Sequence, residues 1–402
     1  MKIFLVGGAV RDKALHLPAK ERDWVVVGGT PEALLKQGFQ QVGREFPVFL
    51  HPKTKEEYAL ARKERKAGSG YHGFICEFSP EVSLEEDLLR RDLTINAMAE
   101  DETGRLFDPY QGMQDLHDKI LRHVSPAFIE DPVRVLRVAR FAARYHHLGF
   151  KLAEETRQLM YQMVKAKELT HLVAERVWQE WQRALTEDNP TVFFNILRIC
   201  GALKIILPEF DALFGVPGLN TRDQGTADVG RLALMHLEQA AIKSPAAVIR
   251  FAALSAELGK NLTHASDWPC HPQAQEYGMI VVDELCQRLR IPKEYRDLAY
   301  LTIKLHQSIR KIIKRDGLSR ASEIVDVLEQ ADAFRRPERF SDLLIVCESI
   351  HSQQVLAAQW LHFLEICQQI AVDDIAGRYQ GAEIKMILRE RRINNLEKLF
   401  KS

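Results

Sequence analysis

The N-terminal third of the chain alternates short apolar runs with polar turns, a pattern typical of strands mixed with helices. The runs at residues 3–6 and 23–27 are the clearest expected strands. Thr30 followed by Pro31 signals the start of a helix, because Thr caps helix N-termini and Pro suits the first helical position. Further strands are expected at residues 48–51, 57–62, 74–78 and 106–108. This pattern predicts an α+β head over residues 1–125.

From about residue 131 to the C-terminus, apolar residues recur at helical spacing and strand patterns disappear. Residues 152–164, 174–185 and 192–200 each predict a helix, as does most of the segment 246–363. A turn-rich connector occupies residues 217–225. We therefore expect an all-helical continuation in three parts: a neck over 126–215, a body over 216–330 and a tail over 331–402.

The composition of the 402 residues narrows the class of protein. With 46% hydrophobic residues the chain can bury large cores, and no apolar run approaches the roughly 18 residues of a membrane span. The six cysteines are far apart without a Cys-x-x-Cys pair, which disfavours zinc knuckles and disulfide scaffolds and predicts buried thiols in a reducing cytoplasm. Because the formal net charge is zero, a polyanion would have to meet a local basic face.

Two carboxylates spaced i, i+2 stand at the head of the strand expected at 23–27. Glu21 and Asp23 should project from one face, with Arg22 pointing to the other. Paired acidic oxygens on rigid backbone suit hard divalent cations, which bind phosphate oxygens and align an attacking hydroxyl. Taken alone, this spacing is more typical of solvated surface acids.

A glycine turn upstream changes the interpretation of this pair. Gly7 and Gly8 follow the first strand, so backbone N–H groups can approach a triphosphate, and Arg11 can bind it through charge-assisted hydrogen bonds. The alternative is an ordinary strand-to-helix turn with Arg11 and Asp12 as a surface pair. Together, the turn and the carboxylates indicate nucleotidyl transfer.

The order of four motifs resembles that of bacterial tRNA nucleotidyltransferases of the polymerase-β superfamily, the CCA-adding enzymes. They are Gly-Gly-x-Val-Arg-Asp at 7–12, the acid-x-Asp pair, Arg-Arg-Asp at 90–92 and Glu-Asp-Pro-Val-Arg at 130–134. The tract Asp-Trp-Val-Val-Val-Gly is most similar to the gammaproteobacterial branch. Many relatives carry Asp where this chain has Glu21, which is still a carboxylate but one methylene longer.

This resemblance implies a polymerase-β-like head that adds C, C and A to the 3′ end of tRNA, with CTP and ATP as substrates, the acceptor arm as partner and Mg²⁺ as cofactor. Glu21 and Asp23 would hold the metal, and Gly8 would lie with Arg11 against the nucleotide. Glu57 would be a third catalytic carboxylate from a neighbouring strand, unless it is a plain charged edge position. A loop at 66–73 would take part in switching the nucleotide added.

Arg91 and Asp92 precede a helix-compatible run at residues 93–98. Arg91 can contact the triphosphate or ribose, and Asp92 can accept a hydrogen bond from a ribose hydroxyl, which fits the family role of selecting ribonucleotides. Alternatively, Asp92 only caps the helix.

A strong helix signature begins after residue 130, with Asp131 as expected N-cap and Pro132 at the first helical position. Beside a triphosphate site, Arg137 and Arg140 would stabilise phosphate and developing pyrophosphate charge. Alternatively, an arginine stripe of this kind is a solvated helix face.

Asp131 and Arg134 match the pairing edges of cytosine and adenine, which both show an amino donor beside a ring acceptor. Uracil and guanine present a carbonyl acceptor beside a ring N–H, so the same pair would leave buried polar groups unpaired, a mismatch that can reject an analogue by about 10⁴ or more. In the resembled family the acid and arginine of this motif have that role. The alternative is that Asp131 is only a helix cap.

Residues 226–260 resemble the region that carries an HD-type phosphohydrolase domain in the gammaproteobacterial branch. Leu232 stands at the first histidine position, and Ala256 and Glu257 replace the His-Asp pair. We therefore expect a helical scaffold used in tRNA binding, without a hydrolase centre. The histidines that remain are His236, His264, His271 and His306.

Two other functions compete with CCA addition. One is a relative that adds only CC or only A, or a poly(A) polymerase of the same superfamily. The other is a non-catalytic tRNA-binding protein on a decayed transferase scaffold, which the retention of Glu21, Asp23 and Arg91 opposes.

Overall fold

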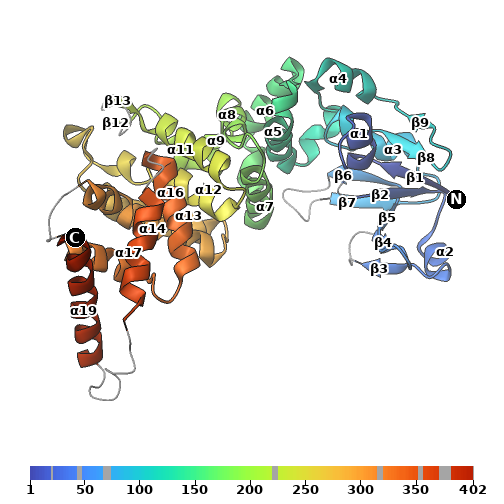
Figure 1. Ribbon diagram of the computed structural model, residues 1–402. Helices are drawn as coiled ribbons and strands as arrows, with labels where there is room; N and C mark the ends of the chain where they lie inside the picture. Colours follow the sequence, from blue (N-terminus) through green and yellow to red (C-terminus); the bar gives the residue numbers. More distant parts are fainter. Residues whose placement is uncertain are drawn as a thin grey trace. The chain divides into compact units, whose positions relative to one another are not determined.

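The computed structural model divides the chain into two units, Met1–Ile206 and Leu207–Ser402, which are described separately (Figure 1). It describes residues 1–19, 21–42, 48–66, 74–219, 225–314, 320–351, 356–370 and 382–401. Apart from Lys66, the loop expected at 66–73 lies outside the described residues. No helix in these ranges is both long and apolar enough to cross a membrane.

In the first unit, the described strands include a seven-stranded mixed sheet in the order β3-β4-β5-β2-β1-β8-β9. β1 (Lys2–Val6) pairs antiparallel with β2 (Asp23–Val27), which pairs in parallel with β5 (Glu57–Leu60). The remaining strands of this sheet are β3 (Gln40–Val42), β4 (Val48–Leu50), β8 (Ala99–Asp101) and β9 (Leu106–Phe107).

The strand expected over 57–62 is interrupted. β5 ends at Leu60, and Arg62 opens β6 (Arg62–Lys66), which pairs with β7 (Phe74–Phe78) in a separate two-stranded sheet. Ala61 lies between them, and its N–H donates to the carbonyl of Val26. The run was correctly assigned to strand, but the prediction of one continuous strand was wrong.

Period-2 alternation in β2 sends its side chains to two different cores. Val25 packs with Phe4 and Val6 on one face, while Val26 packs with Phe49 on the other. Asp23, two residues before Val25, therefore belongs to the first face. The predicted cap of α2 (Pro31–Lys36) is confirmed, since the Thr30 hydroxyl accepts from Ala33 N at 3.2 Å.

Helices complete the first unit, and α5 (Val133–Tyr145) packs against α7 (Ala174–Leu185) and α8 (Thr191–Ile199). α5 begins one residue later than expected, with Pro132 at the cap position. A parallel pair, β10 (Ile120–Leu121) and β11 (Lys151–Leu152), lies within this region. The other α-helices of the unit are α1 (Gly8–Ala14), α3 (Leu84–Leu89), α4 (Gly112–Asp118), α6 (Glu154–Lys165) and α9 (Leu203–Ile206).

In the described part of the second unit, one hairpin accompanies the helices. β12 (Pro217–Leu219) pairs with β13 (Thr226–Asp228), so the expectation that strands end at residue 131 was wrong here and at β11. The helices are α10 (Pro208–Asp211), α11 (Val229–Lys243), α12 (Ala247–Ser255), α13 (Ala274–Arg288), α14 (Lys293–Ile313), α15 (Arg320–Gln330), α16 (Pro337–His351), α17 (Leu356–Gln368) and α19 (Ala382–Lys401).

The cysteines only partly follow the prediction of buried thiols. Cys270 is exposed, which corrects it, because this residue follows Pro269 in a turn region outside the helices. Among the cysteines whose side chains the structure describes, those of Cys200, Cys286, Cys347 and Cys367 are buried, and the side chain of Cys76 lies outside this description.

Candidate active site

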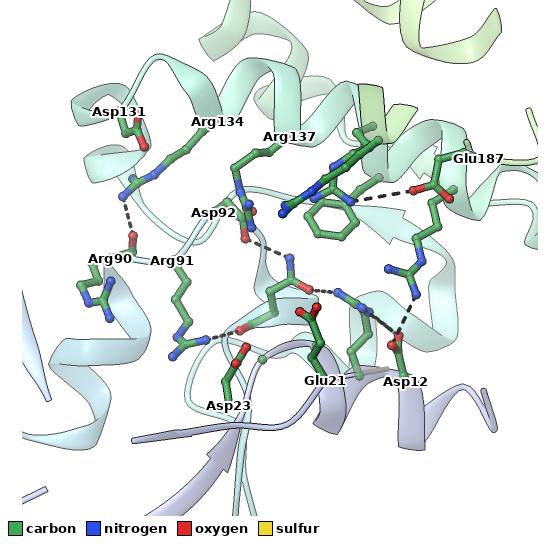
Figure 2. A pocket seen from close by; sticks show the side chains of 18 of the residues that line it. Asp12, Glu21, Asp23, Arg90, Arg91, Asp92, Asp131, Arg134, Arg137 and Glu187 are labelled. Atoms are coloured by element: carbon green, nitrogen blue, oxygen red, sulfur yellow. Dashed lines mark hydrogen bonds and ion pairs between the residues drawn. The ribbon is translucent and has the colours of Figure 1, made fainter. Parts of the chain in front are cut away.

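A cavity of about 780 Å³ lies in the first unit, between the sheet and the helices that follow it (Figure 2). Arginines outnumber carboxylates in its lining, so the cavity suits a polyanion although the chain has no net charge. Apart from Glu57, all the residues assigned to catalysis or nucleotide binding from the sequence line it: Gly8, Arg11, Glu21, Asp23, Arg91, Asp92, Asp131, Arg134, Arg137 and Arg140.

Glu21 and Asp23 both point into this cavity from the start of β2 (Figure 2). Arg22 lies away from it, with Nη1 3.9 Å from Glu56, so the predicted alternation holds. Burial raises the pKa of Asp23; Arg91 opposes the shift and Glu21 adds to it. Since a bound cation would offset both the burial cost and the repulsion, these two oxygen donors fit a divalent metal.

The carboxylate pair would not enclose a metal by itself. Among the described residues no group of three or more His, Cys, Asp or Glu side chains is placed to hold an ion. This arrangement suits Mg²⁺, which is commonly bound by one or two carboxylates together with substrate phosphates.

Glu57 stands directly opposite Asp23 in the parallel pairing of β2 and β5. Residues in register on neighbouring strands share a face of the sheet, so Glu57 lies beside the carboxylate pair. Its side chain is exposed and is not part of the cavity lining. The register agrees with a third carboxylate beside the pair and the position outside the lining agrees with a charged edge residue, so the catalytic role of Glu57 stays a prediction.

The glycine turn packs tightly against the arginine motif. Gly7 has φ +66°, a backbone conformation that other residues rarely adopt, and a Cβ there would lie 2.7 Å from Arg91 Nη1, which would have to shift. Arg11 and Asp12 are 3% and 4% exposed, which excludes a surface pair. Arg11 donates to Asp12 Oδ1 at 2.7 Å and to Asn96 Oδ1, so its guanidinium is held in place in the cavity wall.

Asp92 is held by three donors rather than capping a regular helix. Its Oδ1 accepts from Leu93 N at 2.8 Å and Asn96 Nδ2 at 2.9 Å, and its Oδ2 accepts from Arg137 Nε at 2.7 Å. Burial opposes ionisation, but Arg137 and Asn96 outweigh it and lower the pKa of Asp92. The helix expected over 93–98 is only a 3₁₀ turn, Thr94–Asn96, because these side-chain bonds compete with helical ones.

The arginines of α5 are not a solvated stripe. Arg134 and Arg140 are 5% and 6% exposed, which rules out that alternative for both. Glu180 of α7 accepts from Arg140 Nε at 2.6 Å and lies 3.5 Å from Arg137 Nη1. Asp92 also raises the pKa of Arg137, so this guanidinium stays charged.

Asp131 and Arg134 lie at the start of α5. The Asp131 carboxylate accepts from Val133 N at 3.1 Å and forms two hydrogen bonds with Arg176. Arg134 donates to the carbonyl oxygens of Ala127 and Arg90, both at 2.6 Å. Pro132, and not Asp131 as expected, is the N-cap residue of α5. The Asp131 side chain still accepts the hydrogen bond of a backbone N–H in the first turn, that of Val133.

Several residues that line the cavity or hold its lining side chains were not identified from the sequence. Asn96 links Arg11 to Asp92, and Asp87 pairs with Arg91 at 3.2 Å. A signal was available only on α7, where Arg176 and Glu180 are spaced i, i+4 on a helix whose other face is apolar.

His236, His271 and His306 of the second unit lie within electrostatic range of the buried Glu257. His236 lies 3.6 Å from Glu257, whose carboxylate also pairs with Lys260. His306 lies 3.2 Å from the buried His351, His271 bonds to Thr263 and Pro217, and His264 is exposed. Leu232 and Ala256 are buried. Within the described ranges of this unit, no three His, Cys, Asp or Glu side chains are placed to hold a metal ion.

Comparison with known proteins gives matches over the whole chain. The family described as "Poly A polymerase head domain" matches residues 3–122, and the one described as "Probable RNA and SrmB-binding site of polymerase A" matches 149–214. A multifunctional CCA protein of Legionella pneumophila is 53% identical over all of this chain and 98% of its own length. One from Vibrio cholerae is 50% identical over 99% of this chain and all of its own length.

Solved structures agree in fold. The Bacillus stearothermophilus CCA-adding enzyme in complex with CTP superimposes with a TM-score of 0.67 at 20% identity, over 99% of this chain and 92% of that one. The Thermotoga maritima CCA-adding enzyme complexed with tRNA gives a TM-score of 0.67 at 19% identity, over 99% and 87% of the two chains.

Proposed function

This chain belongs to the bacterial CCA-adding enzymes, and we infer that it adds C, C and A to the 3′ end of tRNA from CTP and ATP, releasing pyrophosphate. The observation that carries this function is one cavity holding an acidic pair at the sheet end and an Asp–Arg pair with further arginines on α5. We place its action in the cytoplasm, where tRNA is matured. We also retain the division into head (1–125), neck (126–215), body (216–330) and tail (331–402).

The proposed mechanism uses the two ends of the cavity for different tasks. Mg²⁺ held by Glu21 and Asp23 would activate the terminal tRNA hydroxyl and neutralise phosphate charge. Gly8, Arg11 and Arg91 bind the triphosphate, and Arg137 and Arg140 stabilise the negative charge that develops on pyrophosphate. Asp92 orients Arg137 and accepts a hydrogen bond from a ribose hydroxyl. Glu57, opposite Asp23 on β5, would be the third carboxylate of this group.

Base selection in this proposal needs no nucleic-acid template. The Asp131 carboxylate accepts a hydrogen bond from the amino group of cytosine or adenine, and the Arg134 guanidinium donates one to the adjacent ring nitrogen. Arg134 is already anchored by two backbone carbonyls, so its guanidinium is pre-positioned. With uracil or guanine, the Asp131 carboxylate would face a carbonyl oxygen and the Arg134 guanidinium would face a ring N–H. Neither protein group could then form its hydrogen bond.

The test offers tRNA transcripts lacking CCA, CA or A to the protein with each nucleotide separately. We expect two additions from CTP, one from ATP onto a CC end, and none from UTP or GTP. Addition of only CC or only A would indicate a partial CCA-adding enzyme, and long tracts of A would indicate a poly(A) polymerase. Binding without incorporation would indicate a non-catalytic tRNA-binding protein.

We further propose that the second unit, Leu207–Ser402, binds the tRNA acceptor arm and elbow by shape and phosphate contacts. A chain ending at residue 206 should bind tRNA at least about tenfold more weakly than the whole protein, with a smaller salt dependence, because phosphate contacts are lost. Filter binding at several salt concentrations measures this. Circular dichroism must show that the shortened chain is folded, and affinity equal to that of the whole chain would contradict the assignment.

We propose that no phosphohydrolase centre operates in the second unit. Lys260 already neutralises Glu257, and burial of His306 and His351 lowers the pKa of both and keeps them uncharged and paired with each other. Purified protein should therefore retain no stoichiometric transition metal and hydrolyse neither phosphomonoesters nor 2′,3′-cyclic phosphates with Ni²⁺, Co²⁺ or Mn²⁺.

Contaminating phosphatases are controlled by assaying Asp23→Asn prepared in parallel, which should give the same background. Stoichiometric metal together with hydrolysis that His236→Ala or His271→Ala abolishes would reveal a rearranged centre.

A further inference from the structure

α7 carries a row of charged residues against the side chains assigned to nucleotide binding. Arg176, Glu180 and Arg183 are spaced i, i+4 and i+7, so they share one helix face. Glu180 is 5% exposed and contacts Arg140, as described above. This face of α7 therefore supplies counter-charges to the start and the middle of α5.

Arg176 is the member of this row that reaches the base-recognition carboxylate. Its Nη1 donates to Asp131 Oδ1 at 3.1 Å and its Nη2 to Oδ2 at 2.7 Å, a bidentate pair. With the bond from Val133 N, three donors fix the plane of the carboxylate. A carboxylate has about four lone-pair sites, so the fixed group can still accept the amino group of a base.

We propose that Arg176 is a positioning residue that determines nucleotide specificity by fixing the Asp131 carboxylate. This inference rests on the proposed role of Asp131 in base selection. The terminal χ2 torsion of aspartate has a broad distribution. Without Arg176, the carboxylate therefore samples more orientations. Hydrogen bonds weaken steeply when misaligned, so the amino groups of cytosine and adenine lose their defined acceptor.

The chemistry at the acidic pair does not depend on this contact. Loss of Arg176 should therefore act mainly on nucleotide binding, raising KM for CTP and ATP by about tenfold or more, which is the cost of one strong charged hydrogen bond. We expect kcat to change much less. Preference for CTP over UTP should fall correspondingly.

The opposite role for Arg176 makes the opposite prediction. If the guanidinium merely occupies Asp131 until a base displaces it, its removal frees the acceptor, and KM for CTP and ATP falls. A purely structural role would lower thermal stability and the amount of active enzyme without changing KM.

The experiment measures kcat and KM for CTP, ATP and UTP on tRNA with the full-length protein and its Arg176→Met and Arg176→Lys variants. Lys keeps the charge but not the bidentate geometry, so it should rescue only part of the effect. The matched control is Arg157→Met, which removes an exposed arginine paired with Glu154 on α6, outside the cavity, and should leave the constants unchanged.

A double variant separates this inference from the proposed function. If Arg176 acts through Asp131, adding Arg176→Met to Asp131→Ala causes no further loss of discrimination. If Asp131→Ala itself leaves the nucleotide preference intact, the proposed base selection fails. If Asp131→Ala relaxes the preference while Arg176→Met leaves KM unchanged or lowers it, only the positioning role is overturned.

Discussion

Asp23→Asn should lower nucleotide incorporation by about 10³-fold or more while tRNA binding stays nearly unchanged. The amide keeps the shape of the side chain but removes the charge that coordinates a divalent ion. An ion of this kind contributes several kcal/mol of transition-state stabilisation, and each 1.4 kcal/mol corresponds to a factor of ten. Single-turnover incorporation in Mg²⁺, together with filter binding of tRNA, measures the two effects.

Thermal melting supplies an independent readout. Partial desolvation in the cavity raises the pKa of Asp23 and the charge of Glu21 adds to this shift, so replacing one of the two carboxylates relieves their repulsion when no metal is bound. Without metal, Asp23→Asn should melt at the same temperature as the native protein or higher, and it should lose the stabilisation that Mg²⁺ gives the native protein. Glu21→Gln should behave similarly.

The matched control for Asp23 is Asp118→Asn, which removes a carboxylate on α4 outside the cavity. It should retain full activity. Near-native turnover in Asp23→Asn would place the metal site elsewhere.

Asp131→Ala should lower the use of CTP and ATP and weaken discrimination against UTP and GTP, each by about 10- to 100-fold. That range corresponds to losing one hydrogen bond to a charged group, about 1.5–3 kcal/mol. Competition assays with mixed nucleotides on a transcript lacking CCA give the ratios directly.

Asp131→Asn distinguishes base recognition from helix capping. The asparagine side chain can still accept the hydrogen bond from Val133 N. If Asp131 only caps the helix, this substitution should therefore cost little stability and leave nucleotide use unchanged. For base recognition the same substitution introduces an N–H donor, and the use of UTP should rise relative to CTP. Unchanged nucleotide preference in both variants, with only a lower melting temperature, would establish the capping role.

Local sequence patterns determined most of the elements that carry the site. The strand at 23–27 and the helix at 174–185 were predicted with the bounds that β2 and α7 have. The acidic pair and its orientation followed from the period-2 alternation of a strand. These features depend on neighbouring residues alone, which is why the chain order was sufficient to predict them.

Predictions failed where side-chain contacts or pairing with distant residues compete with the local backbone pattern. Asp92 is bound by Asn96 and Arg137, which shortens the expected helix to a 3₁₀ turn. The break at Ala61 goes with a hydrogen bond to Val26, 35 positions earlier by residue number, before β6 pairs elsewhere. Neither contact leaves a periodic trace in the sequence.

The sequence by itself predicted which groups line the cavity: a glycine turn, two carboxylates, and an acid and arginines at the start of a helix. Only the tertiary structure decided what holds them. Arg176 reaches Asp131 across 45 residues and Glu180 reaches Arg140 across 40, because α7 packs against α5. Chemical type is a property of each residue, whereas an ion pair depends on the distance and angle that packing imposes, and that is why the partners appeared only with the fold.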